Sequence, residues 1–206
     1  MKTSRNKSRT RGLALFDFDG TIYKKDSLIE FTKYTKGSTR TFVGLVFLSP
    51  VLILNRLGIY PSDKAKLIYL NHFFSNDSKE DFVAKAKEFS LQEIDKSLNK
   101  EMLKKIVLHK QLGDRIIVVS ASLKCWLQPW CKKRGLELAS TEISFENNGL
   151  KYKRKNCTES EKVVRILEKI SNKKYASAIA YGDSSGDDKM IEFAQKYSLQ
   201  TADKQY

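Results

Sequence analysis

Four short apolar segments of the chain have the pattern of buried β-strands. They cover residues 13–18, 115–120, 136–139 and 176–181. The second and the fourth consist mainly of β-branched or small side chains and carry almost no charge, which is typical of strands covered on both faces. Because helical patterns follow these segments, the alternation predicts an α/β fold with a parallel sheet.

Helix and hairpin signals lie between the predicted strands. Residues 158–161 (Thr-Glu-Ser-Glu) have the sequence of a capping box, and apolar residues recur at helical spacing after them. Another helix is predicted over residues 100–112. Residues 143–145 and 150–152 alternate in polarity around an Asn-Asn-Gly turn, which predicts a β-hairpin.

A long insertion separates the first predicted strand from the second. It has roughly a hundred residues, far more than one crossover helix requires. The insertion has mostly helical patterns, so we predict a Rossmann-like core with an inserted helical cap. The predicted divisions are a core of residues 12–23 and 98–206, a cap of residues 24–97, and a flexible basic arm of residues 1–11.

The composition and charge of the chain are compatible with several kinds of partner. The chain has 206 residues, 41% of them hydrophobic, and a formal charge of +14. The apolar content suffices for a packed core, and the charge is compatible with nucleic acid, an anionic membrane or a phosphorylated substrate. Nucleic acid is the unlikely partner, because no helix-turn-helix, zinc or RRM signature is present and the acidic strand ends would repel a phosphate backbone.

The cysteines and the N-terminal region bear on location. Cys125, Cys131 and Cys157 form no paired CxxC spacing, which argues against a disulfide framework or a zinc site and favours a reducing compartment. The apolar run that follows the basic N-terminal residues is too short for a signal peptide. We therefore expect a cytoplasmic protein.

Acidic residues follow two of the predicted strands. Asp17 and Asp19 end the first apolar segment, while Asp183 and Asp187 follow the fourth. The carboxyl ends of parallel strands are where ligands bind in such sheets. Like charges brought together there need a cation, and carboxylate oxygens suit Mg²⁺.

Two further polar residues occupy comparable positions. Ser120 ends the second predicted strand, and Lys162 lies in the first turn of the helix after residue 158. A cation in that turn opposes the helix dipole unless an anion is nearby.

One motif suggests a different mechanism, that of a serine hydrolase, which the rest of the sequence excludes. Residues 182–186 (Gly-Asp-Ser-Ser-Gly) match the nucleophile elbow of serine hydrolases, which needs a histidine after the serine. His72 and His109 both precede it, so this mechanism is excluded.

Taken in order, the Asp-x-Asp-Gly-Thr at residues 17–21, the strand-end Ser120, Lys162 and the Gly-Asp at residues 182–183 resemble the haloacid dehalogenase (HAD) superfamily of phosphatases. The resemblance covers residues 13–23 and 112–194. It extends to the subgroup (subfamily IB) that contains phosphoserine phosphatase and the HAD-type phosphatidylglycerophosphatase. It implies a Mg²⁺-dependent phosphatase that hydrolyses a phosphate monoester through an aspartyl-phosphate.

The resemblance also implies roles for individual residues. Asp17 is expected to attack phosphorus, and Asp19 to act as general acid and then as general base. Ser120 and Lys162 are expected to bind the phosphoryl group, and Thr21 to orient the loop around it.

The implied magnesium site draws on the same loops. The carboxylates of Asp17 and Asp183 and the backbone carbonyl of Asp19 are expected to hold Mg²⁺, with Asp187 supporting them from outside.

The substrate is less closely defined. Members that act on phosphoserine usually have Glu where this chain has Asp26 and Ser where it has Gly20. We therefore rank a lipid phosphate such as phosphatidylglycerophosphate first. The alternatives are phosphoserine or another small phosphorylated metabolite, a phosphotransferase reaction, and, from another class, nucleic-acid binding without catalysis.

The most apolar stretch, residues 42–54, lies in the predicted cap. It is too short to span a bilayer, and Pro50 is expected to interrupt any single helix there. It predicts either a buried pair of helices or a surface that contacts anionic lipid with the help of nearby basic residues, at the inner face of the membrane. The oligomeric state stays open.

Overall fold

A four-stranded parallel sheet forms the centre of the molecule. The computed structural model describes residues 11–147, 149–171 and 173–202. The strand order is β3-β2-β1-β6, and all neighbours are parallel, which confirms the predicted α/β class. The strands are β1 (Leu13–Phe16), β2 (Arg115–Leu123), β3 (Glu137–Thr141) and β6 (Ala178–Tyr181).

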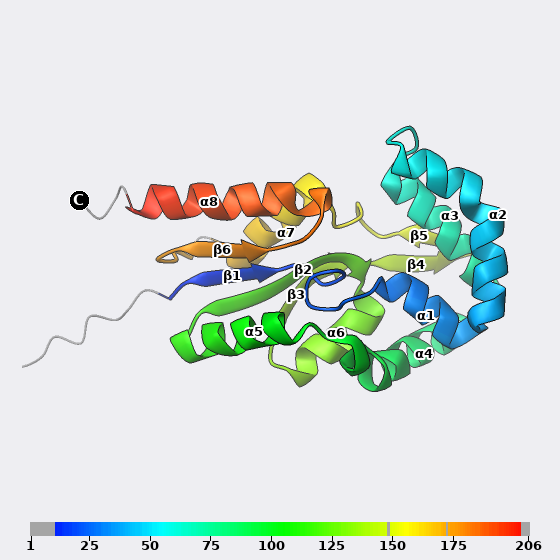
Figure 1. Cartoon of the computed structure of the whole chain (residues 1–206), viewed down its shortest axis with the longest axis horizontal. Coiled ribbons are helices and arrows are strands. Elements are labelled where there is room, and N and C mark those ends of the chain that lie inside the picture. The colour runs from blue at the N-terminus through cyan, green and yellow to red at the C-terminus, as the bar shows by residue number, and fades with distance from the viewer. Residues whose placement is uncertain (1–10, 148, 172, 203–206) are drawn as a thin grey trace, which may run out of the picture.

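Helices cover both faces of this sheet (Figure 1). On one face lie α5 (Lys100–Leu112) and α6 (Lys124–Lys133), and on the other lie α7 (Glu159–Ile170) and α8 (Asp188–Ala202). Along β1, Ala14 and Phe16 enter one apolar cluster, whereas Leu13 and Leu15 enter the other. Burial on both faces explains why this strand has an unbroken apolar sequence.

The insertion is helical, as predicted, and lies beyond the carboxyl ends of the strands (Figure 1). It consists of α1 (Ser27–Lys36), α2 (Ser38–Arg56), α3 (Ser62–Phe74), α4 (Lys79–Gln92) and the 3₁₀ helix η1 (Ile94–Ser97). The division into core and cap at residues 24 and 97 stays a prediction. Residues 1–10 of the predicted basic arm lie outside the described residues.

The predicted hairpin is confirmed and belongs spatially to the cap. It is formed by β4 (Ile143–Glu146) and β5 (Gly149–Tyr152). The Asn71 side chain on α3 donates a hydrogen bond to the Leu150 carbonyl (3.0 Å) and accepts one from the Leu150 amide (2.8 Å). Asn71 thus pairs with the hairpin backbone much as a neighbouring strand would.

The prediction that Pro50 breaks the apolar stretch is wrong, because α2 is one helix with Pro50 inside it. Proline has no amide hydrogen to donate to the carbonyl four residues earlier. The Ser49 hydroxyl donates to that carbonyl, on Val46, at 2.7 Å. A side-chain donor therefore compensates for the missing backbone bond.

The predicted capping box at the start of α7 is also wrong, although the helix does begin after Thr158. Thr158 makes no side-chain cap in the described structure. Glu161 pairs instead with Arg165 at 2.8 Å, and the Arg165 guanidinium donates to the Ser140 carbonyl at 2.8 Å. Glu161 is thus used to neutralise a buried arginine one turn later in the helix.

Candidate active site

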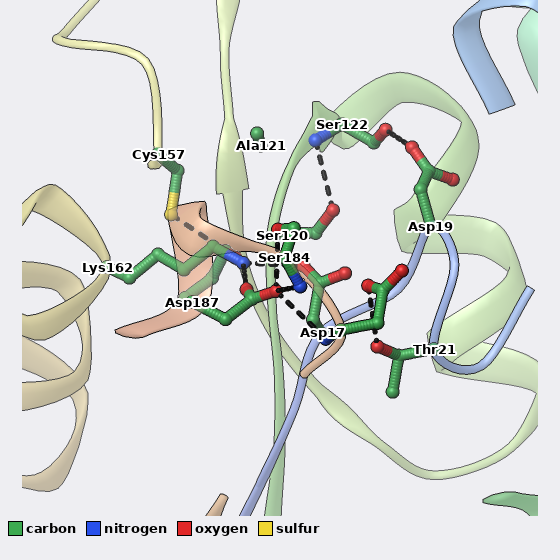
Figure 2. Close-up of polar contacts among 12 residues, drawn as sticks. Asp17, Asp19, Thr21, Ser120, Ala121, Ser122, Cys157, Lys162, Ser184 and Asp187 are labelled. Carbon is green, nitrogen blue, oxygen red and sulfur yellow. Dashed lines mark hydrogen bonds and ion pairs between the residues drawn. The ribbon is translucent and has the colours of Figure 1, made fainter. Parts of the chain in front are cut away.

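The predicted site residues meet at the carboxyl end of the sheet (Figure 2). Asp17 directly follows β1, and its amide donates to the Tyr181 carbonyl at the end of β6 (2.8 Å). This bond ties the first acidic loop to the one that carries Asp183 and Asp187, while β2 delivers Ser120 and α7 delivers Lys162. The parallel topology alone therefore brings together segments far apart in the sequence.

A buried lysine bridges two buried carboxylates. Lys162 Nζ donates to Asp17 Oδ1 at 2.5 Å and to Asp187 Oδ1. Burial raises the pKa of Asp17 to about 6 despite the attraction of the Lys162 ammonium. The ion pair between α7 and β1 supplies the anion that a cation in the first turn of a helix needs.

Asp187 anchors this lysine and the loop after β6. Its Oδ2 atom accepts from the Ser184 hydroxyl (2.8 Å) and from the amides of Ser184 (3.1 Å) and Asp183 (3.2 Å). The bond from the Ser184 amide is one half of a capping box on the 3₁₀ helix η2 (Ser185–Asp187), and the Asp187 amide completes it by donating to the Ser184 side chain. Because both oxygens of Asp187 already accept hydrogen bonds, the geometry suits the supporting role predicted for it.

Asp19 is held by two serines. Ser27 donates to it from its amide (3.1 Å) and its hydroxyl (3.0 Å), and the Ser122 hydroxyl donates as well. Burial, with the negative charges of Asp26 and Asp17, raises the pKa of Asp19 to about 7. This carboxyl can both give and take a proton near neutral pH.

Ser27 and Ser122 were missed as functional residues by the sequence analysis. A signal existed for Ser122, because serines two apart on a strand lie on the same face. Ser122 does not cap the following helix, since Leu123 is the residue that precedes α6. Trp126 fixes Ser27 in turn by donating to its hydroxyl at 3.1 Å.

Ser120 is buried beside this network, and its hydroxyl oxygen accepts from the Ser122 amide at 3.0 Å. A serine that accepts in this way keeps its own proton for donation. Asp26, the departure noted in the sequence, caps α1 by accepting from the amides of Leu28 (2.9 Å) and Ile29 (3.0 Å).

The acidic residues fit a divalent cation. Carboxylate oxygens of Asp17, Asp183 and Asp187 all lie within 4.8 Å of one another. Three carboxylates and the Lys162 ammonium leave a formal charge of −2, and hard oxygen donors are those that Mg²⁺ prefers. Thr21 positions Asp183 by donating to its Oδ1 atom at 3.2 Å.

A cavity of about 260 Å³ opens over Asp19, and we call it the Asp19 cavity. The core contributes Asp19, Ala121 and Ser122 to its wall, and the rest comes from Asp26, which caps α1, and from α1, α2 and α3. A molecule in this cavity would therefore contact both the reactive edge of the sheet and the cap.

Comparison with known proteins finds a matching family model and several similar proteins. The model of haloacid dehalogenase-like hydrolases matches residues 14–192. The protein CicA of Caulobacter vibrioides is 27% identical over 190 residues, which are 89% of this chain and 83% of CicA. No role for this chain follows from that name alone.

Two solved structures show the same fold. A Bordetella pertussis protein of unknown function has a TM-score of 0.74 at 22% identity, with 89% of this chain and 87% of that one covered. A phosphoserine phosphatase solved as a phospho-aspartyl intermediate analogue has a TM-score of 0.61 at 15% identity, with 90% and 84% covered.

Gly20 offers a test of the acidic site. Its φ is +78°, and a Cβ atom there would lie 2.0 Å from Asp183 Oδ2. We expect Gly20→Ala to displace Asp183 and to weaken Mg²⁺ binding about 10- to 100-fold, measured by isothermal titration calorimetry. Gly113→Ala is the control, because its φ is +76° and nothing lies within 4 Å of the added atom. Equal Mg²⁺ affinity in the two variants would contradict this site.

Proposed function

The chain belongs to the haloacid dehalogenase-like hydrolases, and from this premise we propose that it is a Mg²⁺-dependent phosphatase acting through an aspartyl-phosphate on Asp17. The observation that carries the proposal is the division of labour between two nearby carboxyls. Asp17 is paired with Lys162, whereas Asp19 borders the Asp19 cavity between two serines. Such a pair provides a nucleophile and a separate acid and base.

In the first step, an Asp17 carboxylate oxygen attacks phosphorus and the bond from phosphorus to the leaving oxygen breaks. Asp19 gives its proton to that oxygen, and an alcohol departs. The raised pKa of Asp19 keeps a proton available for this transfer.

In the second step, the Asp19 carboxylate takes a proton from water, and the water oxygen attacks phosphorus. The acyl-phosphate bond breaks, which restores Asp17 and releases inorganic phosphate. Ser27 and Ser122 hold Asp19 in one orientation through both transfers.

Two residues stabilise the negative charge on the phosphoryl oxygens during the transfer. Lys162 places its ammonium against Asp17, so it is within reach of oxygens on a phosphorus bonded there. The Ser120 hydroxyl donates a hydrogen bond to another phosphoryl oxygen. Phosphoryl transfer depends mainly on such positioning and charge neutralisation.

The carboxylates of Asp17 and Asp183 and the backbone carbonyl of Asp19 would hold Mg²⁺. When bound, the ion offsets the negative charge that gathers between these carboxylates and the phosphoryl oxygens.

Asp17→Asn tests the nucleophile. Asparagine has the same shape, and Lys162 keeps its bond to Asp187, so the variant is expected to fold. Hydrolysis of p-nitrophenyl phosphate with Mg²⁺ should fall below about one-thousandth of the wild-type rate. Asp188→Asn, which removes an exposed charge next to Asp187, is the control and should stay near wild type. Wild-type turnover in Asp17→Asn would overturn the mechanism.

For the substrate we propose a lipid phosphate, reached at an anionic membrane surface on the cytoplasmic side. The support comes from α2, which has two apolar faces. Leu45 and Leu52 line the Asp19 cavity, whereas Phe42 and Phe47 on the outer face are 68% and 73% exposed. Exposed aromatic side chains gathered on one helix are typical of a contact surface.

The length and burial of α2 sharpen the earlier expectation. The helix has 19 residues and is long and apolar enough to cross a membrane by length and composition, so the apolar stretch is not too short in its helical context. Its inner face nevertheless packs on the cap, where Gly44 lies against Phe73. We therefore propose that α2 lies along the lipid surface with its outer face inserted.

Charge supports the same partner. Residues 31–62 include four basic residues and no acidic one. Lys33 and Lys36 are held in ion pairs with acidic residues outside this segment, whereas Arg40 and Arg56 are exposed. Basic residues near an apolar helix face favour anionic lipid. A soluble metabolite such as phosphoserine is the alternative substrate, and it gives this surface no role.

Vesicle binding tests the lipid surface. The wild type should sediment with vesicles of phosphatidylglycerol and phosphatidylcholine at low salt, less so at high salt. The double variant Phe42→Ser with Phe47→Ser should bind about tenfold or more weakly, since it loses two aromatic anchors. Val107→Ser with Leu108→Ser, which removes exposed apolar residues from α5, is the control.

Two results would contradict the lipid proposal. One is a wild-type protein that ignores these vesicles at low salt. The other is a dimer in analytical ultracentrifugation that the Phe42 and Phe47 substitutions dissociate, because the outer face of α2 would then be covered by a second copy.

A further inference from the structure

A second cavity lies between the cap and the core, separate from the reactive carboxyls. It has a volume of about 360 Å³ and is bordered by α4, by β4 of the hairpin and by the turn from β2 into α6, and we call it the hairpin cavity. Its size lies in the range of small-molecule sites, roughly 300–1,000 Å³. Of the described residues that line it, none is an acidic residue of the proposed active site. The mechanism therefore gives this cavity no role.

Much of the wall of the hairpin cavity is apolar. Phe82 on α4 and Phe145 on β4 meet edge to face, with their ring centroids 5.2 Å apart. Leu123 and Ile143 line the wall beside these rings. Burial raises the pKa of the Cys125 thiol to about 12, so Cys125 adds a neutral and weakly polar surface. The cavity is therefore suited to an apolar group.

The charged part of the lining is basic. Three lysines and one glutamate border the cavity, namely Lys79, Lys124, Lys153 and Glu142. Lys124 pairs with Glu142 at 3.0 Å. Lys79 and Lys153 form no ion pair within residues 11–147, 149–171 and 173–202. The three positive charges and the one negative charge leave the lining at a formal +2, which attracts an anion.

The two features together define a class of ligand. An apolar body gains from leaving water for the wall around Phe82 and Phe145. An anionic group gains from the charges of Lys79 and Lys153 while it stays partly in water. A small hydrophilic anion leaves the apolar wall in contact with water, and an uncharged apolar molecule gains nothing from the lysines. A ligand that satisfies both parts of the lining has both parts itself.

We propose that the hairpin cavity binds an amphipathic anion, namely an acyl chain of medium length that ends in a carboxylate. The chain lies against Phe82 and Phe145, and the carboxylate is directed toward the lysines. The ligand contacts the cap through α4 and the core through Leu123. Leu123 follows Ser122, which donates to Asp19, so the site adjoins the residues that orient the general acid without being part of them. It goes beyond the proposed function because it is not the substrate site.

Titration calorimetry of the full chain with sodium decanoate at low salt tests this site. The wild type should bind decanoate, and decyltrimethylammonium, which has the same chain length and the opposite charge, should bind about tenfold or more weakly. Val83→Trp places a large side chain at the cavity and should weaken decanoate binding about tenfold or more. Val164→Trp on α7 is the control, because Val83 and Val164 are 45% and 44% exposed.

A second pair of variants tests the charge. Lys79→Met with Lys153→Met should weaken decanoate binding about three- to tenfold at low salt, and less at high salt. Lys85→Met with Lys87→Met removes the same charge from exposed positions of α4 that do not line the cavity. The affinity of this control should stay near that of the wild type.

Several results would overturn the inference. They are a wild type that does not bind decanoate, equal affinity for decanoate and decyltrimethylammonium, and equal weakening by Val83→Trp and Val164→Trp. Binding that is lost in Phe42→Ser with Phe47→Ser and retained in Val83→Trp would place decanoate on the outer face of α2 instead.

The phosphatase assay separates this inference from the proposed function. Decanoate should not compete with p-nitrophenyl phosphate, and competition that Val83→Trp fails to remove would place decanoate in the Asp19 cavity, which contradicts the inference. If the wild type hydrolyses no phosphate ester, the proposed function fails, whereas the calorimetric result on the hairpin cavity still stands or falls by itself.

Discussion

The site depends on the contact between the Lys162 ammonium and two buried carboxylates. Asp17 is 6% exposed and Asp187 is fully buried, so neither charge is stable there without a cation. Lys162 joins α7 to the end of β1 and to the loop after β6. The remaining negative charge of the acidic cluster makes a divalent cation its natural complement. The charge balance that permits folding here is therefore the one that phosphoryl transfer needs.

The cap forms most of the cavity wall over this edge. Helix α2 contributes Leu45 and Leu52 to the Asp19 cavity and presents Phe42 and Phe47 outward. Under the proposed function, the same helix contacts substrate on one side and lipid on the other. Part of the net charge of +14 lies around α2, because residues 31–62 include four basic residues and no acidic one. This favours approach to an anionic surface over binding along a nucleic acid.

Much of the core could be predicted from sequence because local patterns and topology agree there. An apolar run covered on both faces predicts a parallel strand, and the acidic or polar residue that follows is placed by the sheet itself. The family is confirmed by the match over residues 14–192. The site roles stay predictions, although the structure brings Asp17, Ser120 and Lys162 to one edge.

Other features depend on side-chain contacts that the sequence patterns did not predict. The Ser49 hydroxyl replaces the hydrogen bond that Pro50 cannot donate within α2. The Asn71 side chain binds the backbone of a hairpin distant in sequence. Glu161 forms an ion pair with the buried Arg165 and does not take part in a capping box. Lys66 contacts the Ala121 carbonyl because α3 folds over the end of β2. The contacts of Asn71 and Lys66 join segments distant in sequence, whereas those of Ser49 and Glu161 are alternative side-chain bonds within one helix.

The covalent step is tested most directly by trapping. The protein would be mixed with p-nitrophenyl phosphate and Mg²⁺, quenched in acid and reduced with borohydride, which converts an acyl-phosphate to an alcohol. Mass spectrometry of the peptide that contains residue 17 should show homoserine in place of Asp17. Homoserine at another carboxylate, or an unmodified Asp17 in a protein quenched while turning over substrate, would contradict the account.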